Sequence, residues 1–137
     1  MVKTLASVLL IASLPLSFNA QAGGNPGRSA MQCVSTSSHG NRIQFRNTCN
    51  QKIFVIWCGD LKYTKKRCGD GPRGNYFTHS HNIRPGDSTE IVLRNGGSYR
   101  YGACVGGVGF GTDEFTSSYG GRFSCKPTGS YARKNRY

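Results

Sequence analysis

The chain has 137 residues, 36% of them hydrophobic, and its 18 lysines and arginines outnumber its 6 aspartates and glutamates, giving a net charge of +12 at pH 7. This length suits a single domain that buries roughly two thirds of its unfolded surface, and the charge favours anionic partners. The hydrolase motifs Gly-x-Ser-x-Gly, His-Glu-x-x-His and Ser-x-x-Lys are absent from the part after residue 22, which excludes the enzyme classes that those motifs define.

The first 22 residues have the pattern of a secretory signal peptide. Lys3 precedes an apolar stretch over residues 5–16, and a small-x-small triplet follows at residues 20–22. The apolar stretch is shorter than the ~20 residues that span a bilayer. We therefore expect cleavage near Ala22 and Gly23 and a secreted or periplasmic mature chain without a transmembrane segment. The mature chain loses only one charge and keeps a net charge of +11.

The six cysteines all lie in the mature part, and an even number in a short exported chain indicates a disulfide framework. They are Cys33, Cys49, Cys58, Cys68, Cys104 and Cys125. Their spacings exceed those of the cysteine pairs in zinc sites, and we predict neither a metal nor a cofactor. Six cysteines allow about 15 pairings. The pairing that we predict is Cys58–Cys68, Cys33–Cys125 and Cys49–Cys104.

The mature chain divides into three parts by composition. A Gly/Pro-rich stretch, residues 23–32, is expected to be a flexible lead-in, and residues 33–126 to form a single disulfide-stabilised β domain. Residues 127–137 are basic and contain no acidic residue, which favours a disordered tail.

The first expected elements are a polar loop over residues 34–41 and two strands. Residues 42–47 alternate apolar and polar side chains, which predicts a half-buried strand. Residues 53–57 are continuously apolar, with β-branched and aromatic side chains, which predicts a strand buried on both faces. Residues 47–51 would then form a hairpin connection between the two.

The second half of the domain is rich in turn signals. After a loop at residues 69–75, residues 75–83 predict a strand with Phe77, His79 and His81 on one face. Pro85-Gly86 favours a type II turn, and Asn95-Gly96 between two alternating segments predicts a hairpin over residues 88–105. A last strand is expected at residues 122–126.

Short strands with Gly/Pro turns every 8–12 residues, and no sustained helical periodicity, predict an all-β fold. We expect a small antiparallel β-sandwich or partly open barrel, stapled by disulfides, with Gly-rich loops such as residues 106–111.

The segment RNTCNQKIFVIWCG, residues 46–59, resembles the strand–Asn-x-Cys–strand opening of thaumatin-like proteins. Those proteins are much longer and far richer in cysteine, and the resemblance is confined to this segment. It therefore implies nothing about function.

The densest charge in the domain lies in one short segment. It consists of Lys62, Tyr63, Lys65, Lys66 and Arg67 around one threonine. Basic residues with an aromatic among them are typical of surfaces that bind phosphate or sulfate polymers. The simpler interpretation is a solvated loop in a protein that is basic throughout, because arginines are also scattered along the chain.

Two histidines could serve chemistry. On a strand, His79 and His81 would point the same way, about 7 Å apart. With His39 or Glu90 they could form part of a metal site or an acid–base pair for RNA cleavage. The simpler interpretation is two exposed polar residues.

The preferred hypothesis is a small secreted or periplasmic, non-enzymatic binding or effector protein. Its basic surface would engage an anionic surface polymer, phospholipid head groups or nucleic acid. One alternative is a small secreted nuclease or other hydrolase that uses His79, His81 and Glu90. Another is an inhibitor or toxin that docks on an unidentified protein.

Overall fold

Eight strands form two three-stranded antiparallel sheets and a separate hairpin in the computed structural model, which describes residues 27–107, 115–117 and 121–126. The first sheet has the order β1-β2-β5 and consists of β1 (Val34–His39), β2 (Arg42–Asn47) and β5 (Ser88–Val92). The second has the order β4-β3-β6 and consists of β4 (His79–Ile83), β3 (Ile53–Gly59) and β6 (Tyr99–Val105).

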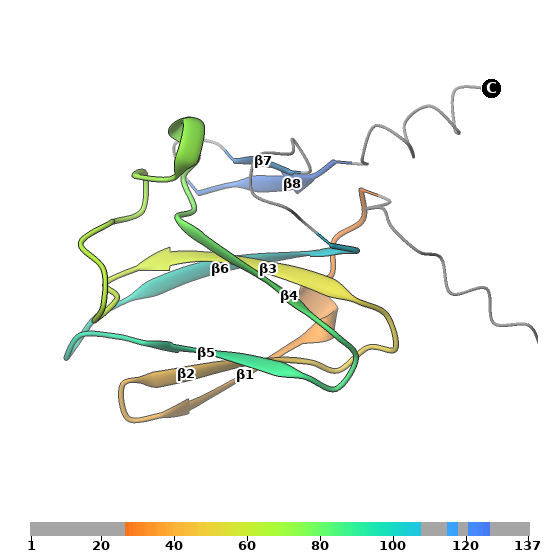
Figure 1. The fold of residues 1–137 in the computed structure, drawn as a ribbon, viewed down its shortest axis with the longest axis horizontal. Coiled ribbons are helices and arrows are strands. Elements are labelled where there is room, and N and C mark those ends of the chain that lie inside the picture. The colour runs from red at the N-terminus through yellow and green to blue at the C-terminus, as the bar shows by residue number, and fades with distance from the viewer. Residues whose placement is uncertain (1–26, 108–114, 118–120, 127–137) are drawn as a thin grey trace, which may run out of the picture.

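The remaining elements lie outside these two sheets. The hairpin pairs β7 (Phe115–Ser117) with β8 (Phe123–Cys125). Two short 3-10 helices are η1 (Met31–Cys33) and η2 (Pro72–Gly74). Figure 1 shows three layers, with β1, β2 and β5 below, β3, β4 and β6 in the middle, and β7 and β8 above.

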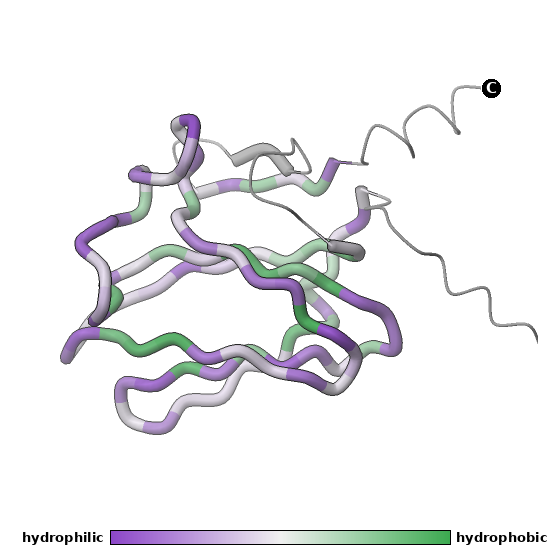
Figure 2. Tube along the Cα trace, in the orientation of Figure 1, coloured by the Kyte–Doolittle hydropathy of each residue, from purple (hydrophilic) through white to green (hydrophobic). Residues whose placement is uncertain are grey.

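The main core lies between the two three-stranded sheets. On β2, Ile43 and Phe45 are buried while their neighbours Arg42 and Arg46 are exposed, which confirms the predicted half-buried strand. Alternation of this kind places one apolar face on the core and one polar face in water. In Figure 2 this alternation is visible as green and purple stretches along β2.

The middle strand, β3, is buried on both faces, as predicted. Its residues Val55 and Trp57 belong to the main core, whereas Phe54 and Ile56 belong to a second cluster on the other side of the sheet. The second cluster is covered by side chains from the 68–77 segment and from β8. A Cβ on Gly102 of β6 would overlap the Phe123 ring, so glycine lets β8 approach the sheet closely.

The prediction of an all-β antiparallel sandwich stapled by disulfides is confirmed. The sheets are open and do not close into a barrel. The Pro85-Gly86 turn is also confirmed, because Asp87 N donates to Arg84 O (3.0 Å) and Gly86 has a φ of 79°.

Both predicted hairpins are wrong, because the strands that they would join lie in different sheets. A turn does form at residues 94–97, where Gly97 N donates to Arg94 O (2.8 Å), but β5 pairs with β2 and β6 pairs with β3. Residues 47–51 likewise connect β2 of one sheet to β3 of the other. A central strand that is apolar on both faces needs a layer on each side, so the chain crosses between layers at these points.

Residues 34–39 form strand β1 and not the predicted polar loop. Gly40, with a φ of 60°, lies in the turn that joins β1 to β2. β1 lies at the edge of its sheet, and Ser35 to His39 are all exposed. Such a strand needs no apolar alternation, which explains why its sequence resembles that of a loop.

Three disulfides are present, but only Cys58–Cys68 matches the predicted pairing. The predicted Cys33–Cys125 and Cys49–Cys104 bonds are wrong, since the structure contains Cys33–Cys49 and Cys104–Cys125. Cys33 and Cys49 meet because β1 and β2 pair antiparallel, with Val34 opposite Asn47. Three disulfides indicate an oxidising extracellular or periplasmic environment.

The end of the predicted lead-in is fixed to the second sheet. Ser29 forms a bridge with Cys104, Ala30 N donates to Ala103 O (2.9 Å), and Ala30 is fully buried.

The predicted signal peptide, residues 23–26 and the predicted tail lie outside the described residues. Within the described ranges, the structure has no helix of the length and apolarity that a membrane crossing requires.

Candidate anion-binding site

The basic segment forms a loop, residues 60–67, that follows β3 and is closed at its base by the Cys58–Cys68 disulfide. The first part of this loop is held by backbone contacts. Leu61 is buried and forms a bridge with Leu93, and Lys62 N donates to Val92 O (2.8 Å). The basic loop is therefore attached to both sheets, through β3 and through the end of β5.

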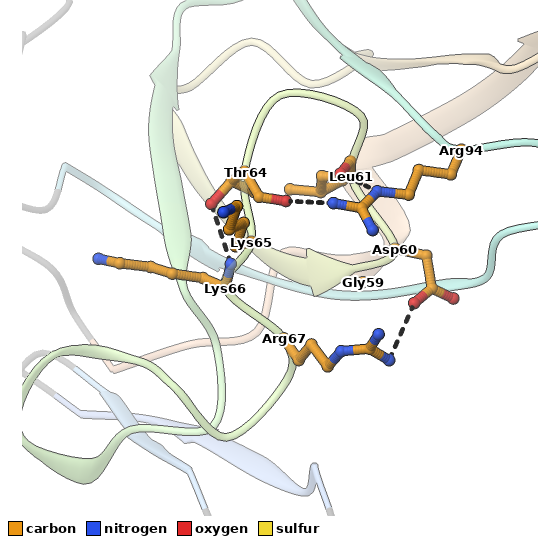
Figure 3. A pocket seen from close by; sticks show the side chains of 8 residues that line it. All are labelled: Gly59, Asp60, Leu61, Thr64, Lys65, Lys66, Arg67 and Arg94. Atoms are coloured by element: carbon orange, nitrogen blue, oxygen red, sulfur yellow. Dashed lines mark hydrogen bonds and ion pairs between the residues drawn. The ribbon is translucent and has the colours of Figure 1, made fainter.

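Arg94 supports the tip of the basic loop from outside it. Its Nε donates to Leu61 O (3.2 Å) and its Nη2 donates to Thr64 O (3.1 Å). Lys66 N in turn donates to Thr64 Oγ1 (3.1 Å), and Figure 3 shows these bonds together. Each bond satisfies a backbone group of the loop, which limits the number of conformations that the loop can adopt.

The basic loop and Arg94 line a pocket of about 310 Å³ (Figure 3). Four cationic side chains, Lys65, Lys66, Arg67 and Arg94, and one carboxylate, Asp60, line it. The carboxylate is already engaged: its Oδ2 accepts from the backbone N–H of residue 98 (3.1 Å), and its Oδ1 lies 3.9 Å from Arg67 Nη1. The pocket therefore has an excess of positive charge.

Three lysines of the basic loop have no acidic partner in the described part of the chain. The ion pairs there join Arg42 to Glu90 (2.6 Å) and Arg67 to Asp60 (3.9 Å). These lysines, Lys62, Lys65 and Lys66, are all exposed. Their charges face water and can attract an anionic partner.

A second pocket, of about 240 Å³, continues the positive surface on the other side of Asp60 and Arg67. It adds Tyr76, Tyr99 and Arg100 to the lining. The guanidinium carbon of Arg100 lies 5.9 Å from the centre of the Tyr76 ring, a distance typical of a cation–π contact.

The predicted anion-binding residues thus lie on one loop, and the structure adds two arginines to them. Arg94 and Arg100 stand out in the sequence only as two of many scattered arginines. Both follow the basic loop by more than 25 residues. They reach it because Leu93, just after β5, pairs with Leu61 of the loop, and because the start of β6 pairs with the end of β3. No local sequence signal could have placed them there.

His79 lies on β4 and stacks on Trp57, with ring centres 5.9 Å apart and an interplanar angle of 12°. Its Nδ1 lies 2.7 Å from Thr78 Oγ1. Burial, and secondarily the positive charge of Lys66, lower the pKa of His79 below its ordinary value of 6.5. The expected common face with Phe77 is wrong, because Phe77 packs in the second cluster on the opposite side of the sheet.

The other histidines and the candidate carboxylate do not join His79 in one cluster. His81 is exposed two residues further along β4, whereas His39 and Glu90 lie on the first sheet, where Glu90 is paired with Arg42. Within residues 27–107, 115–117 and 121–126, no three histidine, cysteine or acidic side chains form a group that could hold a metal ion. The hydrolase alternative therefore gains no support from this placement.

The lowered pKa of His79 predicts a pH-dependent stability. Because the folded state holds this proton less tightly than the unfolded state does, the free energy of unfolding should fall as the pH drops below 6.5 and level off below the folded-state pKa. Urea unfolding on both sides of this pH, for wild type and His79→Gln, measures the effect. The variant should lose less stability on acidification, and an equal loss in both proteins would contradict the assignment.

Comparison of the chain with protein families, curated proteins and solved structures finds no match. No family is therefore assigned on the basis of the local resemblance of residues 46–59 to thaumatin-like proteins.

Within that segment the structure gives Asn47 a clear role. Its buried amide donates to Gln51 O (2.8 Å) and Ile83 O (3.1 Å), which fixes the crossing from β2 to β3.

Proposed function

We propose that this protein is a small, exported, non-enzymatic binding module that uses the basic loop to engage an anionic partner. The observation that supports this most is a loop that is closed by a disulfide and supported by Arg94, and whose lysines have no acidic partner among the described residues. The excess of positive charge in the pocket that the basic loop and Arg94 line also supports the proposal.

Pre-organisation is the physical reason to assign binding to this loop. Ordering a flexible segment on association costs free energy, and a loop that is already fixed avoids most of that cost. Cations held at fixed positions release counterions from a polyanion when they bind it. Affinity for any anionic polymer should therefore decrease as the salt concentration rises.

Export is part of the proposal. Three disulfides form and persist in an oxidising compartment. The signal-peptide pattern of the first 22 residues supplies a route to such a compartment.

A charge-neutralised loop tests the proposed function. In the loop triple variant, Lys62, Lys65 and Lys66 are each replaced by glutamine, which removes three charges without breaking an ion pair of the described residues. Its affinity for a single-stranded oligothymidylate, used as a simple polyanion, should fall by roughly tenfold or more at low salt. Fluorescence anisotropy of the labelled oligonucleotide measures this.

The control removes the same number of charges elsewhere. In the control triple variant, the exposed residues Arg46, Lys52 and Arg84, at the end of the sandwich where β2 crosses to β3, are replaced by glutamine. If the basic loop is the binding surface, this variant should lose much less affinity than the loop triple variant. Equal losses in both variants would show that net charge alone accounts for the binding, and the proposal would be wrong.

A further inference from the structure

One aromatic side chain projects from the basic loop into water. Tyr63 is 80% exposed, and Met31, at 38%, is the other exposed large hydrophobic residue among those that the structure describes. Tyr63 lies between the loop cations, and Lys62 Nζ is 5.5 Å from the centre of its ring. The basic loop therefore presents an amphipathic ring surrounded by positive charge.

We propose that the anionic partner is the surface of a phospholipid bilayer with anionic head groups, on which the basic loop docks with Tyr63 at head-group level. This inference rests on the proposed function and specifies its partner. Tyrosine is enriched at the membrane–water interface, because its ring is apolar and its hydroxyl can remain hydrated.

The lysines around Tyr63 suit the same surface. Each lysine near an anionic membrane is attracted by the surface potential. The long aliphatic stem of a lysine can also lie along the apolar boundary while its ammonium group stays among the phosphates. The exposed Lys62, Lys65 and Lys66 could therefore bind head groups while the ring enters the interface.

The contacts of the loop backbone also favour this docking mode. Arg67 N donates to Asp70 Oδ2 (2.8 Å) at the end of the basic loop, and the Arg94 side chain holds the carbonyl oxygens of Leu61 and Thr64. Tyr63 is thus held at the tip by neighbours that are already ordered. Insertion of its ring needs no refolding of the loop, which lowers the entropic cost of docking.

A nucleic-acid partner is less well supported by the same residues. Proteins that bind single strands stack successive bases on several exposed rings along a groove. Among the residues that the structure describes, Tyr63 is the one exposed aromatic ring on the basic loop. The rings that line the second pocket already have partners. Arg100 lies against the Tyr76 ring, and Tyr101 stacks on Tyr99 with ring centres 6.2 Å apart. A bilayer surface instead suits one interfacial ring that is combined with several basic residues, because the anionic head groups attract each of these residues.

Vesicle sedimentation tests the proposal. Wild type, Tyr63→Ser and the loop triple variant are mixed with phosphatidylcholine vesicles that contain or lack phosphatidylglycerol, at a salt concentration of about 100 mM. Wild type should bind only the anionic vesicles. Tyr63→Ser should bind them roughly fivefold more weakly, whereas the control Met31→Ser, at the other exposed large hydrophobic residue of the described part of the chain, should bind them as wild type does.

A spectroscopic variant tests the insertion itself. Tyr63→Trp should bind anionic vesicles at least as well as wild type, and the emission of the new indole should shift to shorter wavelength on binding. The natural tryptophan, Trp57, is 8% exposed, so its emission should not respond. An unshifted emission would contradict the insertion of this side chain.

The outcomes separate this inference from the proposed function. If Tyr63→Ser binds anionic vesicles as wild type does while the loop triple variant does not, the loop binds anions but the interfacial role of Tyr63 is wrong. If wild type binds oligothymidylate and not vesicles, the partner is a polymer and the inference fails. If the loop triple variant binds both probes as wild type does, the inference and the proposed function both fail.

Discussion

Replacing Phe45 by alanine should lower the free energy of unfolding by roughly 3–5 kcal/mol. Phe45 is fully buried on β2, and its ring centre lies 6.0 Å from that of Trp57, 5.9 Å from Tyr99 and 5.1 Å from Tyr101. These three partners belong to the second sheet. The phenyl ring therefore joins the two sheets at the middle of the main core, and its loss would leave a cavity between them.

Urea unfolding followed by near-ultraviolet circular dichroism measures this loss. Gln44→Ala is a matched control, because Gln44 is the neighbour of Phe45 on the same strand and lies on the opposite face of the sheet. The control should change stability by less than about 0.5 kcal/mol. A cost of less than about 1 kcal/mol for Phe45→Ala would show that the packing between the sheets is not as described.

Removing the Cys58–Cys68 disulfide should weaken anion binding although every charge of the basic loop remains. The double variant Cys58→Ala/Cys68→Ala frees the base of the loop, which the disulfide closes over a sequence separation of 10. We expect a stability loss of roughly 3 kcal/mol from the unfolded-state entropy. We also expect a loss of affinity for anionic vesicles, because the freed loop must be ordered on binding.

The Cys33–Cys49 disulfide provides the control for this variant. It spans 16 residues, so its removal should cost about as much stability as removal of Cys58–Cys68. It ties the start of β1 to the end of β2, and Cys49 precedes β3 whereas the basic loop follows it, so the disulfide and the loop lie at opposite ends of this strand. Cys33→Ala/Cys49→Ala should therefore bind vesicles as wild type does at a temperature where both variants are folded. Equal losses of affinity would mean that the loop constraint has no specific role.

Several elements of the fold could be predicted from local sequence. The continuous apolar run at β3 indicates a strand that is buried on both faces, and the alternation in β2 indicates a strand that is buried on one face. Both predictions are confirmed. The Pro85-Gly86 turn was predictable because the required backbone conformation depends on these two residues. Cys58 and Cys68 are close in sequence, and their pairing needs only a short loop.

The pairing of strands could not be predicted in the same way. Asn95-Gly96 indicates that the chain reverses, but not whether the next strand joins the same sheet or the facing one. The same limit explains the wrong disulfides, because the partner of Cys104 depends on where β8 lies. β1 was missed because an exposed edge strand of serine and threonine lacks a hydrophobic pattern.

The candidate site was predictable to the extent that it is local. The basic residues of the loop are neighbours in sequence, and one charge-rich segment indicates them. The support by Arg94 depends on the position of the end of β5, which only the tertiary structure shows. The histidine pair follows from strand periodicity, but the stacking of His79 on Trp57 depends on the pairing of β4 with β3.

The salt dependence of binding, measured with the same two triple variants, tests the central claim most directly. For a single strand, each cation that contacts a phosphate contributes about 0.7 to the slope of log affinity against log salt concentration. If the basic loop is the binding surface, the loop triple variant should have a slope that is shallower than that of wild type by roughly 2, with the control triple variant close to wild type. Equal slopes for wild type and the loop triple variant would contradict the claim, because Lys62, Lys65 and Lys66 would then make no contact with the anion.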